Sequence, residues 1–516
     1  MIYTDAVRAW LLCAAVVFVL CAWPLLLVEV PPYQDIGNHL AVATIIDHPS
    51  DYPEFVFNGF FKTNAALFAW EHFVGHALSS TLGAIRAFAA VVLAANALAF
   101  TRLLLVARGR AAMITGTLVL APIVHNFCLC LGMLDFCLGL AVAVFLIALL
   151  VEQRGAPTAK RAALIAATSI LAWYTHLIPL FFVLLLVLVE IVVAMFRARG
   201  DLQKLFARAV LPLAPGALLL AWSVLGQLFA RSSVAMTSYA SIWLAPWDLV
   251  ANLWVQWFLA FTPRSIASLA PCLVIAFFAW KNRAVRTPFL SSAAMLAFGA
   301  LYAFVPYVLS FWAFANTRAA AILWTIALVR LPERFPKWLV GTLAACSVAY
   351  SISLGVDYVR LDRDHQEIVS GIDAVPERAA LLPLVFETKG ASVNTRPLSH
   401  AWGFYVNAKH TSAPLVFATS RMFGVAYREP PDPRLEHVGF EHFVGLMRDP
   451  SWICATLKTS TCVDTWRAAW SDFFAHVEPR FDWLLVWDAP AITLGVIPPE
   501  YREVFHNGRL RILHRL

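Results

Sequence analysis

Apolar runs recur along the first 355 residues, and short polar turns separate them. A helix of about 20 apolar residues crosses the hydrocarbon core of a bilayer, and most of these runs approach that length. The pattern therefore predicts about eleven membrane-spanning helices. They cover residues 9–30, 83–107, 111–128, 132–152, 161–177, 179–197, 208–228, 266–280, 288–307, 312–330 and 336–355.

The polar turns differ in charge on the two sides of the predicted membrane. Five alternate turns carry sixteen Lys and Arg: residues 101–110, 152–161, 196–208, 281–286 and 330–337. The opposite turns carry only Lys62, Arg231, Arg264 and Arg318. Cytoplasmic loops are enriched in positive charge, so we expect a cytoplasmic N-terminus. An odd number of helices then places residues 357–516 outside the cytoplasm, as an extracytoplasmic domain that follows a transmembrane domain of residues 1–356.

Two outer turns are long, at residues 31–82 and 229–265. The stretch "NAALFAWEHFVGHALSS" in the first and the Trp-rich "SIWLAPWDLVANLWVQWFLAFTPRS" in the second predict helices that lie in the membrane interface. In residues 357–516, which we call the tail, "AALLPLVF", "FDWLLVWDA" and "LRILHRL" predict strands between helical or irregular segments. The predicted fold class is a polytopic α-helical membrane protein with a mixed α/β extracytoplasmic domain.

The composition agrees with a membrane protein. The 516 residues are 60% hydrophobic and 14% charged, which is too apolar for a soluble protein of this size. The net charge of +7 is carried largely by the predicted cytoplasmic turns, so nucleic acid is not an expected partner. Cys454 and Cys462 lie in the exported tail, where a disulfide is chemically permitted and a pair of free thiols is the alternative.

Polar residues recur at the predicted outer ends of the helices. They are His125 and Asn126 in "VHNF", Asp135 in "GMLDF", His176 in "WYTHL" and Arg318 in "ANTRAAA". Polar groups close to hydrocarbon are costly, so they normally face a cavity and find a partner. The recurrence favours a polar cavity that opens outward, although any one of these residues could be a packing contact.

The segment "VPPYQDIGNHLA" follows the first predicted helix and places Asp35 and His39 at the same level. Residues four apart share one face of a helix. Asp35 could therefore belong to the cavity, or it could cap a helix that the two prolines separate from the first span.

This layout resembles the GT-C superfamily of membrane glycosyltransferases, and especially a group of bacterial GT-C-like proteins. The resemblance rests on "YQDIGNHLA", "NFCLCLGMLDFCLGLAV", "WYTHL" and "ANTRAAA", and on a first helix followed by a long outer loop with an early acidic residue. It implies a bacterial inner-membrane enzyme that takes a sugar from a polyprenyl-phosphate lipid and passes it to a sugar, glycolipid or glycan acceptor.

The resemblance implies that Asp35 is the catalytic base or positions the acceptor. Arg318 could bind phosphate oxygens with its planar guanidinium. Glu71 is the candidate second carboxylate, with a solvated interfacial residue as the alternative. The candidates for donor binding are His39, His125, Asn126, Asp135, His176 and Arg318.

Two pairs of residues four apart, Asp35 with His39 and His72 with His76, could each supply two ligands to a divalent cation such as Mg or Mn. No third ligand is recognisable in the sequence. Two other functions stay open: a lipid or polysaccharide transporter or flippase, and a non-catalytic GT-C-like scaffold in envelope polysaccharide assembly. Many GT-C members carry two adjacent acidic residues at this point of the loop. This chain has Gln34 before Asp35, so the non-catalytic scaffold remains an alternative function.

Overall fold

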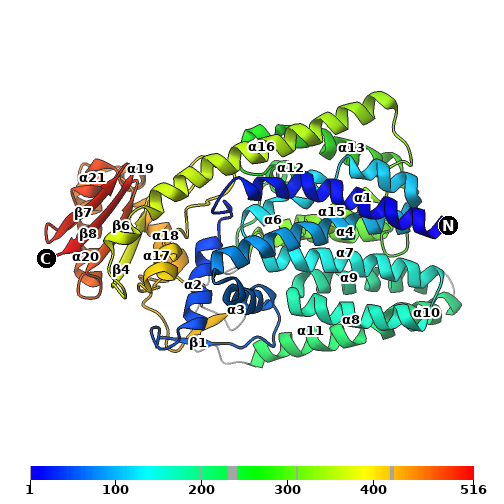
Figure 1. Ribbon diagram of the computed structural model, residues 1–516, viewed down its shortest axis with the longest axis horizontal. Helices are drawn as coiled ribbons and strands as arrows, with labels where there is room; N and C mark the ends of the chain where they lie inside the picture. Colours follow the sequence, from blue (N-terminus) through cyan, green and yellow to red (C-terminus); the bar gives the residue numbers. More distant parts are fainter. Residues whose placement is uncertain (1, 197–198, 230–240, 310–311, 419–422) are drawn as a thin grey trace.

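The computed structural model describes residues 2–196, 199–229, 241–309, 312–418 and 423–516. The chain is mostly helical, and its long helices run side by side between two ends of an elongated bundle (Figure 1). The N-terminus lies at one end of the bundle, whereas the C-terminal sheet lies beyond the other end. We call the end that carries the sheet the tail end.

The bundle is built from helices that follow the predicted apolar runs. They are α1 (Ile2–Ala22), α4 (Thr81–Thr117), α7 (Leu134–Gly155), α8 (Ala159–Thr175), α9 (Leu177–Met195), α11 (Leu211–Phe229), α13 (Leu269–Lys281), α14 (Ser292–Phe304), α15 (Ala315–Leu328) and α16 (Lys337–Val369). The short polar helix α10 (Arg199–Leu205) lies between α9 and α11 in the chain, in a predicted polar turn.

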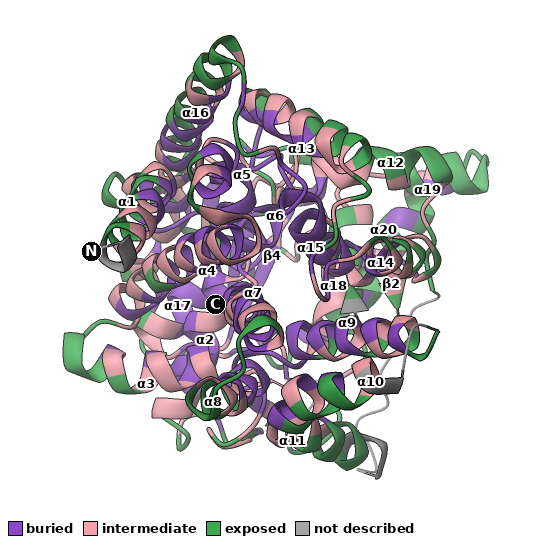
Figure 2. Ribbon diagram, turned by 90° about the vertical axis from the view of Figure 1, so that its right-hand side faces the viewer, coloured by how far each residue is buried: buried purple, intermediate pink, exposed green. Residues whose placement is uncertain are grey.

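The bundle has the surface of a membrane protein. In the described part of the chain, seven helical segments are long and apolar enough to cross a bilayer. Large apolar side chains such as Leu12 on α1, Leu188 on α9 and Leu218 on α11 are exposed on the outside of the bundle. Figure 2 shows buried residues in the middle and exposed ones on the outer faces of helices such as α8, α11 and α16. The protein is a multi-pass membrane protein, and the total of eleven spans stays a prediction.

The predicted span at 111–128 is not one continuous helix. Gly109 has φ +85° and ψ 178°, which only glycine adopts readily, and it interrupts α4. A Cβ on Gly116 would lie 2.4 Å from a methyl carbon of Leu104, so the chain turns back on itself after Gly109. The returning segment is then broken into two short helices, α5 (Ala121–Val124) and α6 (Phe127–Cys130). Pro122 at the start of α5 and Asn126 at the cap of α6 account for the two interruptions.

The long outer turns form helices at the tail end. The first contains α2 (Ile36–Asp47), strand β1 (Phe55–Phe57) and α3 (Ala66–Leu78). The second contains α12 (Pro246–Val255), none of whose residues is buried, as expected for a helix in the membrane interface. Residues 230–240 of this predicted turn lie outside the described residues. A short hairpin of β2 (Val308–Leu309) and β3 (Trp312–Ala313) precedes α15.

The tail contains a four-stranded mixed sheet in the order β4-β6-β8-β7. The three predicted strand runs form β4 (Leu381–Val385), β6 (Trp483–Trp487) and β8 (Leu510–Arg515), and β7 (Tyr501–Asn507) completes the sheet. Strand β4 is parallel to β6, and the other two pairs are antiparallel. The helices of the tail are α17 (Gly403–Lys409), α18 (His437–Leu446), α19 (Ser451–Leu457), α20 (Cys462–Val477) and α21 (Ala491–Leu494).

The predicted boundary at residue 357 falls inside α16, which runs without interruption to Val369. Helix α16 therefore extends from the bundle towards the sheet without a break, and residues 370–380 complete the connection to the sheet (Figure 1).

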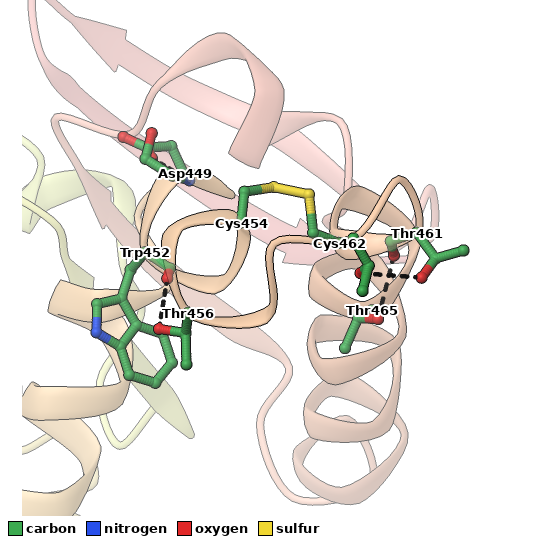
Figure 3. Close-up of a disulfide and its surroundings, with 9 residues drawn as sticks. Asp449, Trp452, Cys454, Thr456, Thr461, Cys462 and Thr465 are labelled. Atoms are coloured by element: carbon green, nitrogen blue, oxygen red, sulfur yellow. Dashed lines mark hydrogen bonds between the residues drawn. A yellow bond between two sulfur atoms is a disulfide. The ribbon is translucent and has the colours of Figure 1, made fainter.

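A disulfide joins Cys454 at α19 to Cys462 at the start of α20 (Figure 3). It closes the turn between these two helices. The sequence left this pairing open, and the structure decides it in favour of the disulfide.

The tail packs directly on the first outer loop. Strand β1 pairs with β5 (Val425–Tyr427) of the tail in an antiparallel ladder. Buried apolar residues of α2, including Val42 and Ile45, belong to the same hydrophobic core as those of the tail helices. The outer loop and the tail thus form one structural unit, and this contact carries tail residues to the start of α2.

Two glycines, Gly37 in α2 and Gly403 in the tail, allow the backbones of these two segments to come into close contact. A Cβ on Gly403 would lie 1.8 Å from the carbonyl oxygen of Gly37, and one on Gly37 would lie 1.7 Å from the carbonyl oxygen of His400. No side chain can relieve these clashes, because both obstacles are backbone atoms. The backbones of α2 and the tail must separate if either glycine acquires a side chain.

Gly403→Ala is expected to lower the free energy of unfolding by about 3 kcal/mol, the upper end of the usual range for overpacking. Thermal unfolding of the purified protein in detergent, followed by tryptophan fluorescence, measures the change. Gly445→Ala in α18 is the control, because a Cβ there meets nothing within 4 Å. Equal stability of the two variants would contradict the tight backbone contact.

Candidate functional site

A cavity of about 350 Å³ lies at the tail end of the bundle, between α2, the α6–α7 turn, α9, α15 and the tail. Five of the residues predicted from the sequence line it: Asp35, His39, Asp135, His176 and Arg318. They are up to 283 positions apart in the chain, so the shared cavity is a property of the fold. Apolar side chains, among them Phe68, Phe136 and Phe314, make up much of the remaining wall.

Asp35 occupies the N-cap position of α2, but its carboxylate makes no capping hydrogen bond. Instead, Oδ1 lies 3.1 Å from Nδ1 of His400. Gly132 of the α6–α7 turn presses against Asp35 from the other side, since a Cβ there would lie 2.8 Å from the Asp35 backbone nitrogen. Gly132 also has φ +80°, so both the lack of space for a Cβ and the backbone conformation require glycine at this position. Asp35 is therefore held by its ion pair and by the backbone around it.

His400 links two carboxylates and is almost completely buried, with 2% of its surface exposed. Its Nε2 lies 3.1 Å from Oε1 of Glu441, opposite the contact with Asp35. Burial disfavours a charged ring, but Glu441 and Asp35 outweigh it and raise the pKa of His400 to about 10. The same interaction lowers the pKa of Glu441 despite its burial. At neutral pH the site therefore contains a charged imidazolium, His400, between the carboxylates of Asp35 and Glu441. We call these three residues the Asp35–His400–Glu441 series.

His400 and Glu441 were not among the residues predicted from the sequence. Both lie in the tail, more than 360 positions from Asp35, and neither stands in a pattern that differs from an ordinary polar surface. Only the packing of the tail on α2 brings them to the cavity.

The charged state of His400 predicts how stability depends on pH. Its folded-state pKa of about 10 exceeds its ordinary value of 6.5, so the ion pairs stabilise the folded protein fully below pH 6.5. This contribution declines as the pH rises above 6.5 and is lost above about pH 10. Thermal unfolding measured from pH 6 to 11 should show this decline in the wild type, whereas His400→Gln should lack it. Parallel profiles for the two proteins would show that His400 is neutral in the folded state.

Two other histidines line the cavity through contacts with backbone atoms. His39 Nε2 lies 3.0 Å from the carbonyl oxygen of Gly132, one turn of α2 after Asp35. Burial lowers the pKa of His39 from its ordinary value. His176 caps α9, because its Nδ1 accepts a hydrogen bond from the backbone N–H of Ile178 at 3.2 Å. Both rings are held in place and line the cavity, and neither forms an ion pair with a described residue.

Asp135 contributes to the cavity wall and also caps a neighbouring helix. Its Oδ1 accepts a hydrogen bond at 2.9 Å from the backbone N–H of Leu67 in the first turn of α3. Helix N-termini favour a negative charge, so Asp135 joins α3 to the start of α7. Asp135 therefore makes a packing contact, the alternative that its sequence position left open, and lines the cavity as well.

Arg318 lies in the first turn of α15 and is half-buried. Its guanidinium lies 5.7 Å from the ring centre of Phe136, and Nη2 lies 3.9 Å from the sulfur of Met133. In the part of the chain that the structure describes, no carboxylate lies within ion-pair distance of Arg318, and its buried Nε has no hydrogen-bond partner. A guanidinium that lines the cavity and forms no ion pair with a described residue can bind an anion.

His125 and Asn126 do not line this cavity, and their predicted role in donor binding is therefore not supported by their position. Both are completely buried. His125 Nε2 lies 3.0 Å from the hydroxyl of Tyr358, and Asn126 caps α6 by accepting a hydrogen bond from Leu129 N–H at 3.2 Å. They stabilise the broken segment between α4 and α7.

Glu71 also lies outside the residues that line the cavity. It is 1% exposed, so the alternative of a solvated residue is wrong. Neither carboxylate oxygen has a hydrogen-bond partner among the described residues. Burial, with further contributions from Asp135 and Asp47, raises the pKa of Glu71 well above its ordinary value. Two other carboxylates, Asp135 and Glu441, line the cavity together with Asp35.

The two predicted metal pairs have different surroundings. Asp35 is paired with His400, and within the described residues no third ligand joins Asp35 and His39. His72 and His76, in contrast, lie close to Asp47 at the end of α2. This second group lies outside the cavity.

Solved structures of other proteins share this architecture. No family model and no curated protein sequence matches the chain. Among solved structures, ArnT from Cupriavidus metallidurans in the apo state matches with a TM-score of 0.54 and 13% identity, over 99% of this chain and 98% of ArnT. ArnT bound to undecaprenyl phosphate matches with a TM-score of 0.53 and 12% identity, over the same shares. This chain and ArnT therefore share a fold.

The chain has the GT-C fold. A mutant of the arabinofuranosyltransferase AftD from Mycobacteria also matches, with a TM-score of 0.52 and 14% identity. The match covers 98% of this chain but 41% of AftD, so the chain spans about two fifths of that protein. The GT-C resemblance predicted from the sequence is confirmed at the level of the fold. Within this GT-C fold, the cavity lies beside the early acidic residue of the first outer loop, Asp35.

Proposed function

We propose that the chain is a membrane glycosyltransferase, which moves a sugar from a polyprenyl-phosphate donor to an acceptor at the extracytoplasmic face of the membrane. The observation that carries the proposal is the cavity itself, in which the Asp35 carboxylate and the Arg318 guanidinium line the same space, and Arg318 forms no ion pair with a described residue. Sugar transfer from a lipid phosphate needs a base for the acceptor and a cation for the departing phosphate. These two side chains provide both.

The donor phosphate would bind to Arg318, because guanidinium offers phosphate oxygens two parallel N–H donors. His39 and His176 are close enough to the same space to hydrogen-bond phosphate or sugar. The apolar wall of Phe68, Phe136 and Phe314 suits the first isoprene units of the lipid. The structural similarity to ArnT, which has been solved with undecaprenyl phosphate bound, supports a lipid ligand of this class.

Asp35 would act as the base. The acceptor hydroxyl attacks the anomeric carbon, its proton passes to the Asp35 carboxylate, and the sugar–phosphate C–O bond breaks. The electron pair of that bond goes to the phosphate, where Arg318 stabilises the added charge. His400 would be a positioning residue, since it fixes the Asp35 carboxylate and is itself fixed by Glu441.

The charge distribution supports an extracytoplasmic site. The described residues of the five turns that together carry sixteen Lys and Arg lie at the end of the bundle opposite the cavity (Figure 1). The positive-inside rule places that end in the cytoplasm and the cavity outside. A lipid-linked donor fits this side of the membrane, and the lipid would enter the cavity between helices.

Binding of undecaprenyl phosphate to the purified protein tests the proposal. A ligand at 100 times its Kd stabilises a folded protein by about 2.7 kcal/mol, which thermal unfolding detects. We expect stabilisation by undecaprenyl phosphate but none by undecaprenol, which lacks the anion for Arg318. Equal effects of the two lipids would contradict a phosphate site, and binding without transfer to any acceptor would favour the scaffold function.

A further inference from the structure

A cluster of one carboxylate and two imidazoles lies at the junction of α2 and α3, outside the cavity. Asp47 is the last residue of α2, and His72 and His76 are one turn apart on α3. Each offers one ligand atom, and the three ligand atoms lie within 4.8 Å of one another. His72 Nδ1 is already 2.6 Å from Oδ1 of Asp47.

The charge of Asp47 is not compensated by a fixed cation. Among the described residues its only ion-pair partner is His72, which is charged only when protonated. A neighbouring group of similar composition, His48, Asp51 and His410, differs in this respect. There, Arg378 lies 2.9 Å from Asp51 and neutralises it. Of the two groups, the one at Asp47 can accept a metal cation without displacing an arginine.

We propose that Asp47, His72 and His76 bind a zinc ion. Two imidazole nitrogens and one carboxylate oxygen are a ligand set that Zn²⁺ prefers, and zinc often binds three protein ligands with water in the fourth position. His76 is exposed, which leaves an open side for that water. The rings of Phe60 and Phe73 lie 5.2 Å and 4.9 Å from the ring of His72 and pack against it.

The ion would hold the end of α2 against α3. Zinc replaces any proton shared between His72 and Asp47, so binding releases protons and weakens as the pH falls below the range in which imidazole is neutral. Asp47 lies 12 residues after Asp35, which is about 18 Å along a helix. The zinc would thus fix the two helices of the outer loop and would not contact the reacting groups in the cavity.

Zinc binding to the full chain in detergent tests this inference. The protein is purified through a tag without histidine, stripped with a chelator and titrated with Zn²⁺ in competition with a chromophoric chelator. We expect one tightly bound zinc per chain and a higher midpoint of thermal unfolding in its presence. His76→Ala should weaken zinc binding at least tenfold, and because His76 is exposed the variant should still fold.

His48→Ala is the matched control, because it removes an exposed histidine from the neighbouring group and should leave zinc affinity unchanged. Wild-type affinity in His76→Ala would overturn the proposal, as would a wild-type protein that binds no zinc at micromolar concentration. Loss of the ion in His48→Ala with retention in His76→Ala would assign the zinc to the neighbouring group and would also overturn it. None of these outcomes depends on glycosyl transfer.

Discussion

Arg318→Met is expected to weaken binding of undecaprenyl phosphate by about 10- to 150-fold. Methionine keeps the apolar stem of the side chain about as far as Nε but removes the guanidinium that lines the cavity. Hydrogen bonds to charged groups contribute about 1.5–3 kcal/mol, and each 1.4 kcal/mol is a factor of about ten in Kd. The shift of the unfolding midpoint with lipid concentration gives Kd for the two proteins.

The variant should fold, because Arg318 makes no ion pair with any described residue that the substitution would break. Its present contacts, with the sulfur of Met133 and the face of Phe136, are compatible with a thioether. Arg334→Met is the control, since Arg334 is exposed in the turn between α15 and α16, at the opposite end of the bundle. If both variants bind the lipid as tightly as the wild type, Arg318 is a packing residue and the phosphate binds elsewhere.

The positions of the helices could be predicted from the sequence because each depends on a local run of apolar residues. The predicted span at 111–128 is not one helix in the structure, and this difference has a local cause as well. Gly109 and Pro122 interrupt a stretch that is otherwise apolar enough to span the membrane. Average hydrophobicity does not register such interruptions. Backbone conformation at single residues decides whether the returning segment is one helix or several.

The site was only partly predictable. Asp35 and Arg318 stood out because each is a charged residue next to a long apolar run, where an unpaired charge is costly. His125 stood out for the same reason, but the hydroxyl of Tyr358 satisfies its ring inside the protein. A polar residue at the end of an apolar run is thus compatible with a cavity or with a buried hydrogen bond, and the sequence does not distinguish the two.

His400 and Glu441 could not be predicted from their neighbours in the chain. Their position depends on the contact between Gly37 and Gly403, in which two backbones approach so closely that neither residue can carry a side chain. The tail thereby supplies two of the three groups in the Asp35–His400–Glu441 series. A charged histidine between two carboxylates holds both of them in fixed positions, which a solvated aspartate at a helix start would not achieve.

Asp35→Asn is expected to lower the rate of sugar transfer by about 100- to 10,000-fold, which is the usual contribution of a general base. Asparagine has nearly the same shape but cannot take the acceptor proton. The substitution should not weaken α2, because the Asp35 carboxylate makes no capping hydrogen bond and asparagine is an equally good N-cap residue. Single-turnover transfer from a polyprenyl-phosphate sugar measures the chemical step.

Two measurements separate the loss of a base from a general loss of structure. Undecaprenyl phosphate should bind to Asp35→Asn about as well as to the wild type, since Arg318 is unchanged. His400→Gln should reduce transfer less than Asp35→Asn, because it disturbs the position of the base but leaves the base itself. If Asp35→Asn transfers sugar at the wild-type rate, the carboxylate takes no proton in the reaction, and its pairing with His400 serves only to fasten the tail to α2.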